Sequence, residues 1–274
     1  MAADPRDQLP EPLRHAVDQT VAAERLEGWQ PSPEHLSDLV RLARDEVGFG
    51  DYLAAHRARY PTAARGQART YGLVFRRGGP YLIAGTTLLR NNFGADTHDM
   101  LQDLEYIATA GRILQWHRRL IDGGVGVDAV DVRMLHRHAF ADVYPWAGNY
   151  RSIELRRGDT LFVPQSAVVH AMTRIVAGAR QPAATGVELD TAALSYELAR
   201  LYTDYNYVHP FREGNGRTGT LLLHTMASLC GRRLDLTSVT RQQWYAASRD
   251  SAPAGRDGQA DHRPFLPLFA RALR

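Results

Sequence analysis

The sequence predicts a mainly α-helical protein with one β-hairpin and a small helical module at its N-terminus. Apolar residues recur at helical spacing through most of the 274 residues, which predicts packed amphipathic helices. Residues 151–165 instead alternate around a central Gly-Asp turn, which is the pattern of a β-hairpin. Pro and Gly interrupt residues 61–67. We therefore expect a helical module over residues 1–58 and a larger domain over residues 68–274.

Three helices are expected in the N-terminal module. The first would end at Gly28, because glycine adopts the left-handed conformation that closes many helices. Ser32 is predicted to cap the second helix, with Pro33 as its first residue. A third short helix is expected near Asp51.

In the larger domain, a helix is predicted on each side of one unusual loop. Residues 194–205 have helical spacing after Asp190, a plausible N-cap, and residues 218–229 have it again. Between them, residues 209–217 read His-Pro-Phe-Arg-Glu-Gly-Asn-Gly-Arg. This run therefore ends where the second helix begins.

The loop contains the residue types that hold the phosphates of a nucleotide for attack by a hydroxyl. A helix N-terminus attracts anions, and Gly214 and Gly216 let the backbone approach them without a side chain in the way. Arg217 can bind phosphate oxygens through two hydrogen-bond donors, and Glu213 is a hard oxygen ligand suited to Mg²⁺. His209 can take up a proton near neutral pH, which suits a general base. We interpret the loop as the active site of a nucleotidyl-transferring enzyme.

Residues 209–217 resemble the signature of Fic domains, His-Pro-Phe-x-Asp/Glu-Gly-Asn-Gly-Arg. Residues 81–94 resemble the Gly-Thr-x-x-Leu-x-Asn-x-x-Gly segment of that family, and residues 140–148 resemble its Asp-Val-Tyr-Pro-Trp-Ala-Gly element. The resemblance covers most of the chain. It implies a Fic-type helical bundle with a hairpin flap over the active site.

The resemblance also implies a reaction, the transfer of a nucleoside monophosphate to a Ser, Thr or Tyr hydroxyl of a target protein. The donor in Fic domains is usually ATP, which supplies AMP. His209 would deprotonate the hydroxyl, and Glu213 would hold Mg²⁺ on the phosphates. The backbone of residues 214–216, with Asn215 at its centre, would stabilise charge on the α-phosphate. Arg217 would steady the leaving pyrophosphate.

The expected hairpin places Ile153 and Leu155 on one arm and Leu161 and Val163 on the other. In Fic domains this flap pairs with an extended segment of the target, which positions the target hydroxyl through main-chain hydrogen bonds. The resemblance thus makes these four residues a target-docking flap. A structural hairpin without a partner is the alternative, and the protein itself is a further candidate target.

One position departs from the family pattern. Many Fic domains carry a second arginine, three residues after the first, that contacts the γ-phosphate, and here that position is Thr220. A hydroxyl cannot replace a guanidinium on a triphosphate. Two alternatives to AMP transfer follow, namely transfer of another nucleoside monophosphate or of phosphate, and a catalytically idle scaffold that acts by binding. Phosphate-transferring Doc toxins usually have Lys in place of Gly216, which disfavours phosphate transfer.

The N-terminal helices resemble the small antitoxins that inhibit Fic toxins through a Ser/Thr-x-x-x-Glu-Gly/Asn motif. The chain matches this motif at Glu27 and Gly28 but has Ala23 at the hydroxyl position. We therefore predict Glu27 as the inhibitory residue, acting on a donor other than the missing second arginine. Thr20 with Glu24 gives a competing register whose Gly/Asn position does not match. A solvated glutamate at a helix end is the alternative.

Composition limits the remaining classes. The net charge of +3 is modest and scattered, so nucleic acid is not expected as the main partner. No apolar run is long enough to span a membrane, and the N-terminus lacks the apolar core of a signal peptide. The single cysteine cannot form an internal disulfide. We therefore expect a cytoplasmic protein with no membrane partner.

Overall fold

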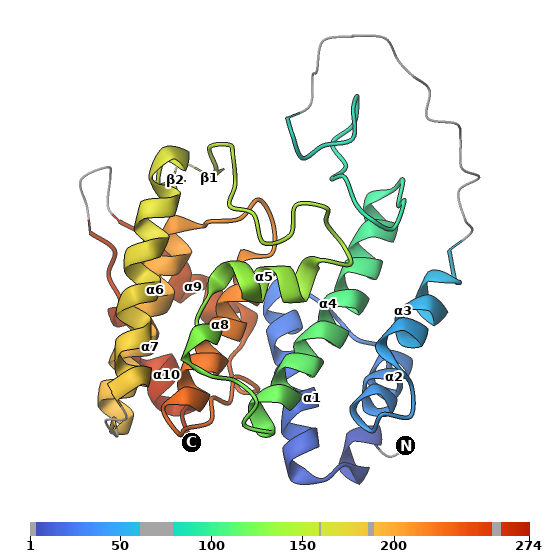
Figure 1. Ribbon diagram of the computed structural model, residues 1–274, viewed down its shortest axis with the longest axis horizontal. Helices are drawn as coiled ribbons and strands as arrows, with labels where there is room; N and C mark the ends of the chain where they lie inside the picture. Colours follow the sequence, from blue (N-terminus) through green and yellow to red (C-terminus); the bar gives the residue numbers. More distant parts are fainter. Residues whose placement is uncertain (1–3, 61–78, 159, 186–188, 254–258) are drawn as a thin grey trace.

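The computed structural model describes residues 4–60, 79–158, 160–185, 189–253 and 259–274. This part of the chain is mainly α-helical, as predicted, and none of its helices is long and apolar enough to cross a membrane (Figure 1). The helices are α1 (Glu11–Glu27), α2 (Pro33–Ala43), α3 (Phe49–Arg57), α4 (His98–Ile121), α5 (Val132–Phe140), α6 (Val168–Thr185), α7 (Thr191–Val208), α8 (Asn215–Leu229), α9 (Arg241–Asp250) and α10 (Leu266–Ala272). Two short strands, β1 (Arg156–Arg157) and β2 (Thr160–Leu161), pair with each other.

Helix α8 lies at the centre of the hydrophobic core. From Asn215 to Ala227 every residue except Gly216 is buried. The helix packs against α1, α4, α5 and α7. Because residues 209–214 join α7 to α8, the C-terminus of one central helix lies next to the N-terminus of the other. The loop singled out by the sequence is therefore supported on several sides by packed helices.

The N-terminal helices pack against the rest of the protein. Helix α1 lies along α4 and also contacts α8 and α9 (Figure 1). Its buried face, which includes Val17, Val21 and Leu26, belongs to the same hydrophobic core as the later helices. Residues 61–78, which contain the predicted boundary between module and domain, lie outside the described residues. The division into two domains stays a prediction.

The predicted helix ends are confirmed where their capping residues are described. Gly28 closes α1 with a left-handed φ of 109°. The Ser32 hydroxyl accepts a hydrogen bond from the backbone N–H of His35 at the start of α2, and Asp190 caps α7 in the same way. Helix α3 begins at Phe49, close to its expected position. These ends were predictable because each depends on residues within one turn of the helix.

The hairpin is much shorter than the alternation over residues 151–165 predicts. Only two residue pairs form, Arg156 with Leu161 and Arg157 with Thr160, and Asp159 of the predicted turn lies outside the described residues. Beyond these pairs the N–H of Phe162 still donates to the carbonyl of Leu155, at 3.3 Å, but the same register places Pro164, which has no N–H to donate, opposite Ile153. The N–H of Val163 donates to the carbonyl of Tyr207, at 3.3 Å. The carbonyls of residues 153 and 163 accept hydrogen bonds from one arginine side chain.

Two histidines face each other where α4 contacts α8. The rings of His117 and His224 lie 4.5 Å apart and nearly perpendicular, and both side chains are buried. Among the described residues, the Nε2 atom of each ring has no hydrogen-bond partner. Burial lowers the pKa of His117 to about 3, and it lowers the pKa of His224 well below the ordinary value. Both rings are therefore neutral in the folded protein at pH 7.

We expect acid to destabilise the protein through these rings. A histidine whose pKa is about 6.5 when unfolded and lower when folded takes up its proton only on unfolding, so stability is lost as the pH falls below about 6.5. At pH 5 each such histidine costs about 2 kcal/mol. In urea unfolding at pH 7 and pH 5, His117→Leu should lose less unfolding free energy than wild type, by about that amount. An equal loss in both proteins would contradict a neutral, buried His117.

Candidate active site

The loop between α7 and α8 is held in shape by the side chain of Asn215. Its Oδ1 atom accepts a hydrogen bond from the backbone N–H of Phe211, and its Nδ2 atom donates one to the Phe211 carbonyl, both at 2.9 Å. Phe211 itself is fully buried. Only an amide offers an acceptor and a donor side by side for such a reciprocal contact. Asn215 therefore fixes the loop between His209 and the start of α8.

The N-terminus of α8 is open to a ligand because glycines stand on both sides of Asn215. Gly214 has a left-handed φ of 80°, and a Cβ atom there would overlap the ring of Phe140. A Cβ atom at Gly216 would overlap the carboxylate of Glu27. The first N–H groups of a helix have no partner within the helix and carry positive partial charge. The structure thus provides an anion-binding geometry, with the carboxylate of Glu27 beside it.

His209 follows the last residue of α7 and has a left-handed backbone, with φ 49° and ψ 60°. Its ring lies parallel to the ring of Phe162 from the hairpin, with centroids 4.0 Å apart. Burial and the nearby positive charge of Arg157 lower the pKa of His209 to about 3. The imidazole is therefore neutral at pH 7 and can accept a proton.

Two cavities meet at this loop. The first, about 310 Å³, has in its lining Glu27, Leu155, Phe162, His209, Glu213, Asn215 and Gly216. The second, about 420 Å³, has in its lining Glu27, Glu105, Tyr144, Glu213 and Arg217. Glu213 borders both cavities, is partly exposed, and accepts a hydrogen bond from the N–H of Gly214 at 3.2 Å. The predicted base, metal ligand, anion hole and inhibitory residue are thus brought together.

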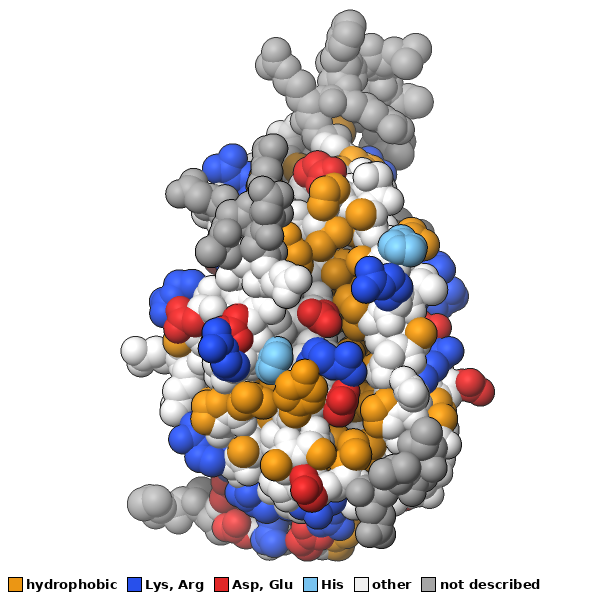
Figure 2. Space-filling view, turned by 90° about the vertical axis from the view of Figure 1, so that its left-hand side faces the viewer, with side chains coloured by type: hydrophobic (Ala, Val, Ile, Leu, Met, Phe, Trp, Pro, Cys, Tyr) orange, Lys and Arg blue, Asp and Glu red, His pale blue; other side chains and the backbone are white. Residues whose placement is uncertain are grey.

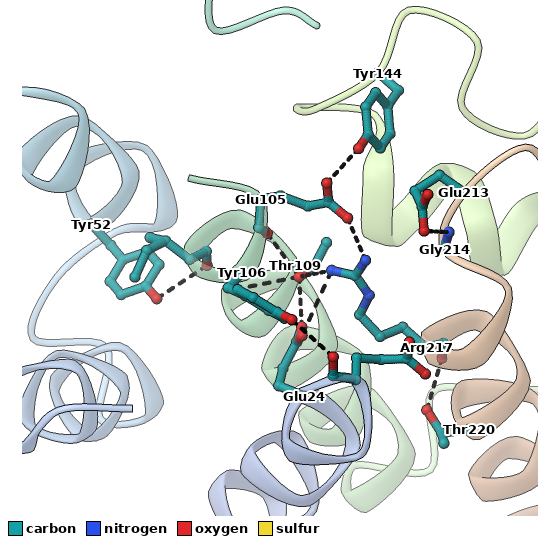
Figure 3. Close-up of polar contacts among 12 residues, drawn as sticks. Glu24, Tyr52, Glu105, Tyr106, Thr109, Tyr144, Glu213, Gly214, Arg217 and Thr220 are labelled. Atoms are coloured by element: carbon teal, nitrogen blue, oxygen red, sulfur yellow. Dashed lines mark hydrogen bonds and ion pairs between the residues drawn. The ribbon is translucent and has the colours of Figure 1, made fainter. Parts of the chain in front are cut away.

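Arg217 is buried and is held by groups from other helices (Figure 3). Its guanidinium donates to the carboxylate of Glu105 and to the hydroxyl of Thr109 on α4, the latter at 3.1 Å. It also lies 4.7 Å from the centroid of the Phe140 ring. The second carboxylate oxygen of Glu105 accepts a hydrogen bond from the hydroxyl of Tyr144. Arg217 is therefore fixed in the wall of the second cavity.

The two glutamates at the end of α1 have different surroundings. Glu24 is fully buried, accepts a hydrogen bond from Thr109 at 2.6 Å, and places its Oε2 atom 3.7 Å from Arg217 (Figure 3). Burial raises the pKa of Glu24 to about 8 against the attraction of Arg217. Glu27 lies instead against Gly216, and burial raises its pKa as well. Of these two glutamates, the one that lies beside Arg217 is therefore Glu24, from the competing register.

Thr220 does not face the cavities as an arginine would. Its side chain is buried, and its hydroxyl donates to the carbonyl of Arg217 at 2.8 Å (Figure 3). This bond to the preceding turn of its own helix occupies the hydroxyl proton. The position of the second family arginine therefore contributes no positive charge in this chain.

The four predicted flap residues do not share one environment. Leu155 lines the first cavity, whereas Ile153 and Val163 are partly buried against the core. Leu161 is 48% exposed, which leaves it free to contact another molecule. The segment therefore contributes Leu155 to the lining of the first cavity and leaves Leu161 exposed to solvent.

Two buried side chains in and around the site were not predicted from the sequence. Glu105 neutralises Arg217 from α4, and Arg151 bonds to carbonyls on both sides of the hairpin. Arg217 lies 112 residues after Glu105, and His209, whose carbonyl Arg151 also bonds, lies 58 residues after Arg151, so spacing within a motif gives no signal for them.

The face shown in Figure 2 has Arg and acidic side chains interspersed over its described part. A nucleic-acid-binding surface gathers basic side chains into a patch or stripe, which neutralises successive phosphates. The scattered charges of this face do not have that form.

Comparison with known proteins identifies the family. The model of the Fic/DOC family matches residues 126–227. The probable protein adenylyltransferase y4lH of Sinorhizobium fredii is 32% identical over 183 residues, which are 64% of this chain and 91% of that protein. The probable protein adenylyltransferase Fic of Escherichia coli is 26% identical over 174 residues, which are 63% of this chain and 84% of that protein. This chain belongs to the Fic/DOC family.

Solved structures show the same fold. BepC of Bartonella tribocorum, a VirB-translocated effector crystallised with AMPPNP, superposes with a TM-score of 0.58 at 18% identity, covering 71% of this chain and 96% of that one. A Fic family protein of Desulfovibrio desulfuricans superposes with a TM-score of 0.53 at 15% identity, covering 97% of this chain and 64% of that one. The second match extends over nearly the whole chain.

The overlap at Gly214 can be tested by substitution. Gly214→Ala adds both left-handed strain and a clash with Phe140, whereas Gly85→Ala adds strain alone, because Gly85 has a φ of 79° and open space where its Cβ would lie. We expect Gly214→Ala to lower the unfolding free energy by about 1–3 kcal/mol more than Gly85→Ala does. Equal losses in urea unfolding would show that the loop does not pack on Phe140 as described.

Proposed function

We propose that this protein is an adenylyltransferase that moves AMP from ATP to a hydroxyl side chain of a target protein. The observation that carries the proposal is the neutral ring of His209 in one cavity with the open N-terminus of α8. A base and an anion hole side by side are what attack of a hydroxyl on a phosphate requires. Membership of a family whose relatives are probable adenylyltransferases supports it. The nucleotide bound by BepC, AMPPNP, is an analogue of ATP.

The proposed step is a displacement at the α-phosphorus of ATP. The target oxygen forms a bond to that phosphorus, and the bond to the bridging oxygen breaks, so pyrophosphate leaves with the electron pair. His209 takes the hydroxyl proton on its ring. Anionic phosphates beside the ring favour its protonated form, so nucleotide binding would raise the pKa of His209 from the value in the free protein. The ring then becomes a stronger base when substrate is present.

The other loop residues would manage the phosphate charge. Backbone N–H groups at Gly214, Asn215 and Gly216 would bind oxygens of the α-phosphate. Glu213 fits a divalent cation, because it is a partly exposed hard carboxylate that borders both cavities. Mg²⁺ there would neutralise charge on the α- and β-phosphates. Arg217 would act on the leaving pyrophosphate from the wall of the second cavity.

The hairpin would position the target. We propose that an extended target segment pairs with it, with Leu161 as an exposed contact and Ile153, Leu155 and Val163 as the supporting residues. Main-chain pairing fixes the depth at which a side chain reaches the cavity while tolerating different sequences. A hydroxyl of the protein itself would be accepted if it reached the same place.

The end of α1 would restrain the enzyme. The Glu27 carboxylate lies where a Cβ of Gly216 would be, so it occupies space beside the anion hole and repels phosphate. In this proposal Glu27 is the inhibitory residue, as the motif predicts, and Glu24 serves to hold Arg217.

Thr220 favours a second candidate function, in which a different nucleotide is the donor, because that position offers no cation to a γ-phosphate.

The reaction can be tested by label transfer from α-³²P ATP, GTP, CTP and UTP with Mg²⁺, read on the protein itself and on lysate proteins. We expect transfer from ATP and at least a roughly 100-fold loss in His209→Ala, because the general base is removed. His170→Ala, which changes an exposed histidine on α6, is the matched control and should keep full activity. Transfer from another nucleotide alone would favour the second candidate. Transfer from none, in wild type and in Glu27→Gly alike, would refute both and favour the binding scaffold.

The proposed inhibition can be tested with two substitutions of Glu27 that differ in side-chain size and charge. Glu27→Gln keeps the size and removes the charge, whereas Glu27→Gly removes both, so we expect transfer rates in the order Gly, Gln, wild type, with Gly at least about tenfold faster than wild type. Glu46→Gln alters an exposed glutamate in the same part of the chain and should leave the rate unchanged. Rates in Glu27→Gly equal to or below wild type would exclude an inhibitory role for Glu27.

A further inference from the structure

Arg151 is a buried arginine that the proposed chemistry does not use. It follows the loop after α5, and its side chain has no solvent exposure. Burying a guanidinium is costly unless its donors are satisfied. The nearest carboxylate, Glu154, has its Oε2 atom 3.6 Å away and is itself 66% exposed. The position of Arg151 must therefore be explained mainly by its hydrogen bonds.

All of those bonds go to backbone carbonyls of two segments. The Nε atom donates to the carbonyl of His209 at 2.9 Å, and one terminal nitrogen donates to that of Ile153 at 2.8 Å. The other terminal nitrogen donates to the carbonyls of Val163 and Val208, the latter at 3.2 Å. One guanidinium thus joins both ends of the hairpin segment, residues 153–163, to the end of α7.

The carbonyls at the end of α7 need such a donor. The last carbonyls of a helix have no partner within the helix. His209 also leaves the helix with a left-handed backbone, which is unfavourable for a residue with a side chain and persists only when its surroundings hold it. The backbone N–H of Arg151 adds a further bond, at 2.8 Å, to the carbonyl of Pro210. Arg151 therefore binds the carbonyl of His209 and also the carbonyls of the residues before and after it, Val208 and Pro210.

The hairpin segment is aligned with His209 by the same contacts. Next to the carbonyl bound by Arg151, the N–H of Val163 donates to the carbonyl of Tyr207. One residue earlier, Phe162 stacks its ring on the imidazole of His209. The hydrogen bonds of the Arg151 guanidinium thus set the distance between the hairpin and the His209 ring.

We propose that Arg151 is a positioning residue for the transfer proposed above, because it fixes the hairpin segment and the His209 ring relative to each other. A target segment paired with the hairpin would then present its hydroxyl at a constant distance from the ring. The kinetic consequence of this inference rests on the proposed function. The hydrogen bonds by which Arg151 joins residues 153–163 to the end of α7 do not depend on any activity.

Lysine cannot take over this role. Its ammonium has three donors on one atom, whereas the contacts of Arg151 need donors on three nitrogens held in one plane. Arg151→Lys should therefore keep the charge and lose the alignment. Arg180→Lys is the matched control, because the partly buried Arg180 also bonds two backbone carbonyls, those of Val130 and Asp128, away from the loop.

The experiment combines kinetics, nucleotide binding and hydrogen exchange on the full chain. We expect Arg151→Lys to lower kcat for a target at least tenfold while the Kd for AMPPNP changes less than twofold, since the anion hole is untouched. The amides of Phe162 and Val163 should exchange at least tenfold faster. Arg180→Lys should leave kcat and these amides unchanged. If Arg151→Lys does not fold, exchange in wild type decides instead: the amides of Phe162 and Val163 should exchange as slowly as that of His209, whose carbonyl the same guanidinium binds, and much faster exchange in the hairpin segment would overturn the inference.

Each outcome decides the inference. Kinetics and exchange in Arg151→Lys that match those of Arg180→Lys would overturn it. A parallel loss of AMPPNP affinity would also overturn it, because a general structural defect would then explain the slower rate. If neither wild type nor Glu27→Gly transfers label, the proposed function fails, and exchange at Phe162 and Val163 still decides whether Arg151 joins the two segments.

Discussion

A guanidinium removed from water needs opposite charge beside it, and Arg217 obtains this charge from Glu105 on α4, which accepts its hydrogen bond. Glu24 on α1 lies 3.7 Å away and joins the same group through Thr109, whose hydroxyl accepts from Arg217 and donates to Glu24. Loss of Glu105 would leave buried positive charge poorly compensated. This constraint holds α1, α4 and α8 in one arrangement. It also determines where Glu27 lies, because residues three apart share a face of α1.

The site is consequently built from the ends of three helices. The C-terminus of α7 carries His209, the N-terminus of α8 forms the anion hole, and the C-terminus of α1 brings Glu27 to Gly216. The hydroxyl of Tyr106 fixes this last end by donating to the carbonyl of Glu27 at 3.0 Å. In the proposed mechanism a nucleotide would displace the Glu27 side chain rather than the helix, so the inhibition would reside in one side chain on a packed helix.

The sequence predicted those features that depend on neighbouring residues. The helix ends at Gly28 and Ser32 and the loop before α8 follow from capping and spacing, which act within a few residues. Glu105 and Arg151 were not predicted as site residues, because each bonds to residues far along the chain. The hairpin is shorter than the alternation predicts because its register places Pro164, which has no N–H to donate, opposite Ile153. Alternation alone does not give that register.

The central claim is that Glu27 occupies the edge of the phosphate site while Glu24 and Glu105 hold Arg217 in place. The most direct test is a crystal structure with AMPPNP and Mg²⁺. The account predicts phosphates on the backbone of residues 214–216, the Glu27 side chain turned away, and Arg217 still bound to Glu105. Nucleotide bound elsewhere with Glu27 still against Gly216, or an Arg217 released from Glu105, would contradict it.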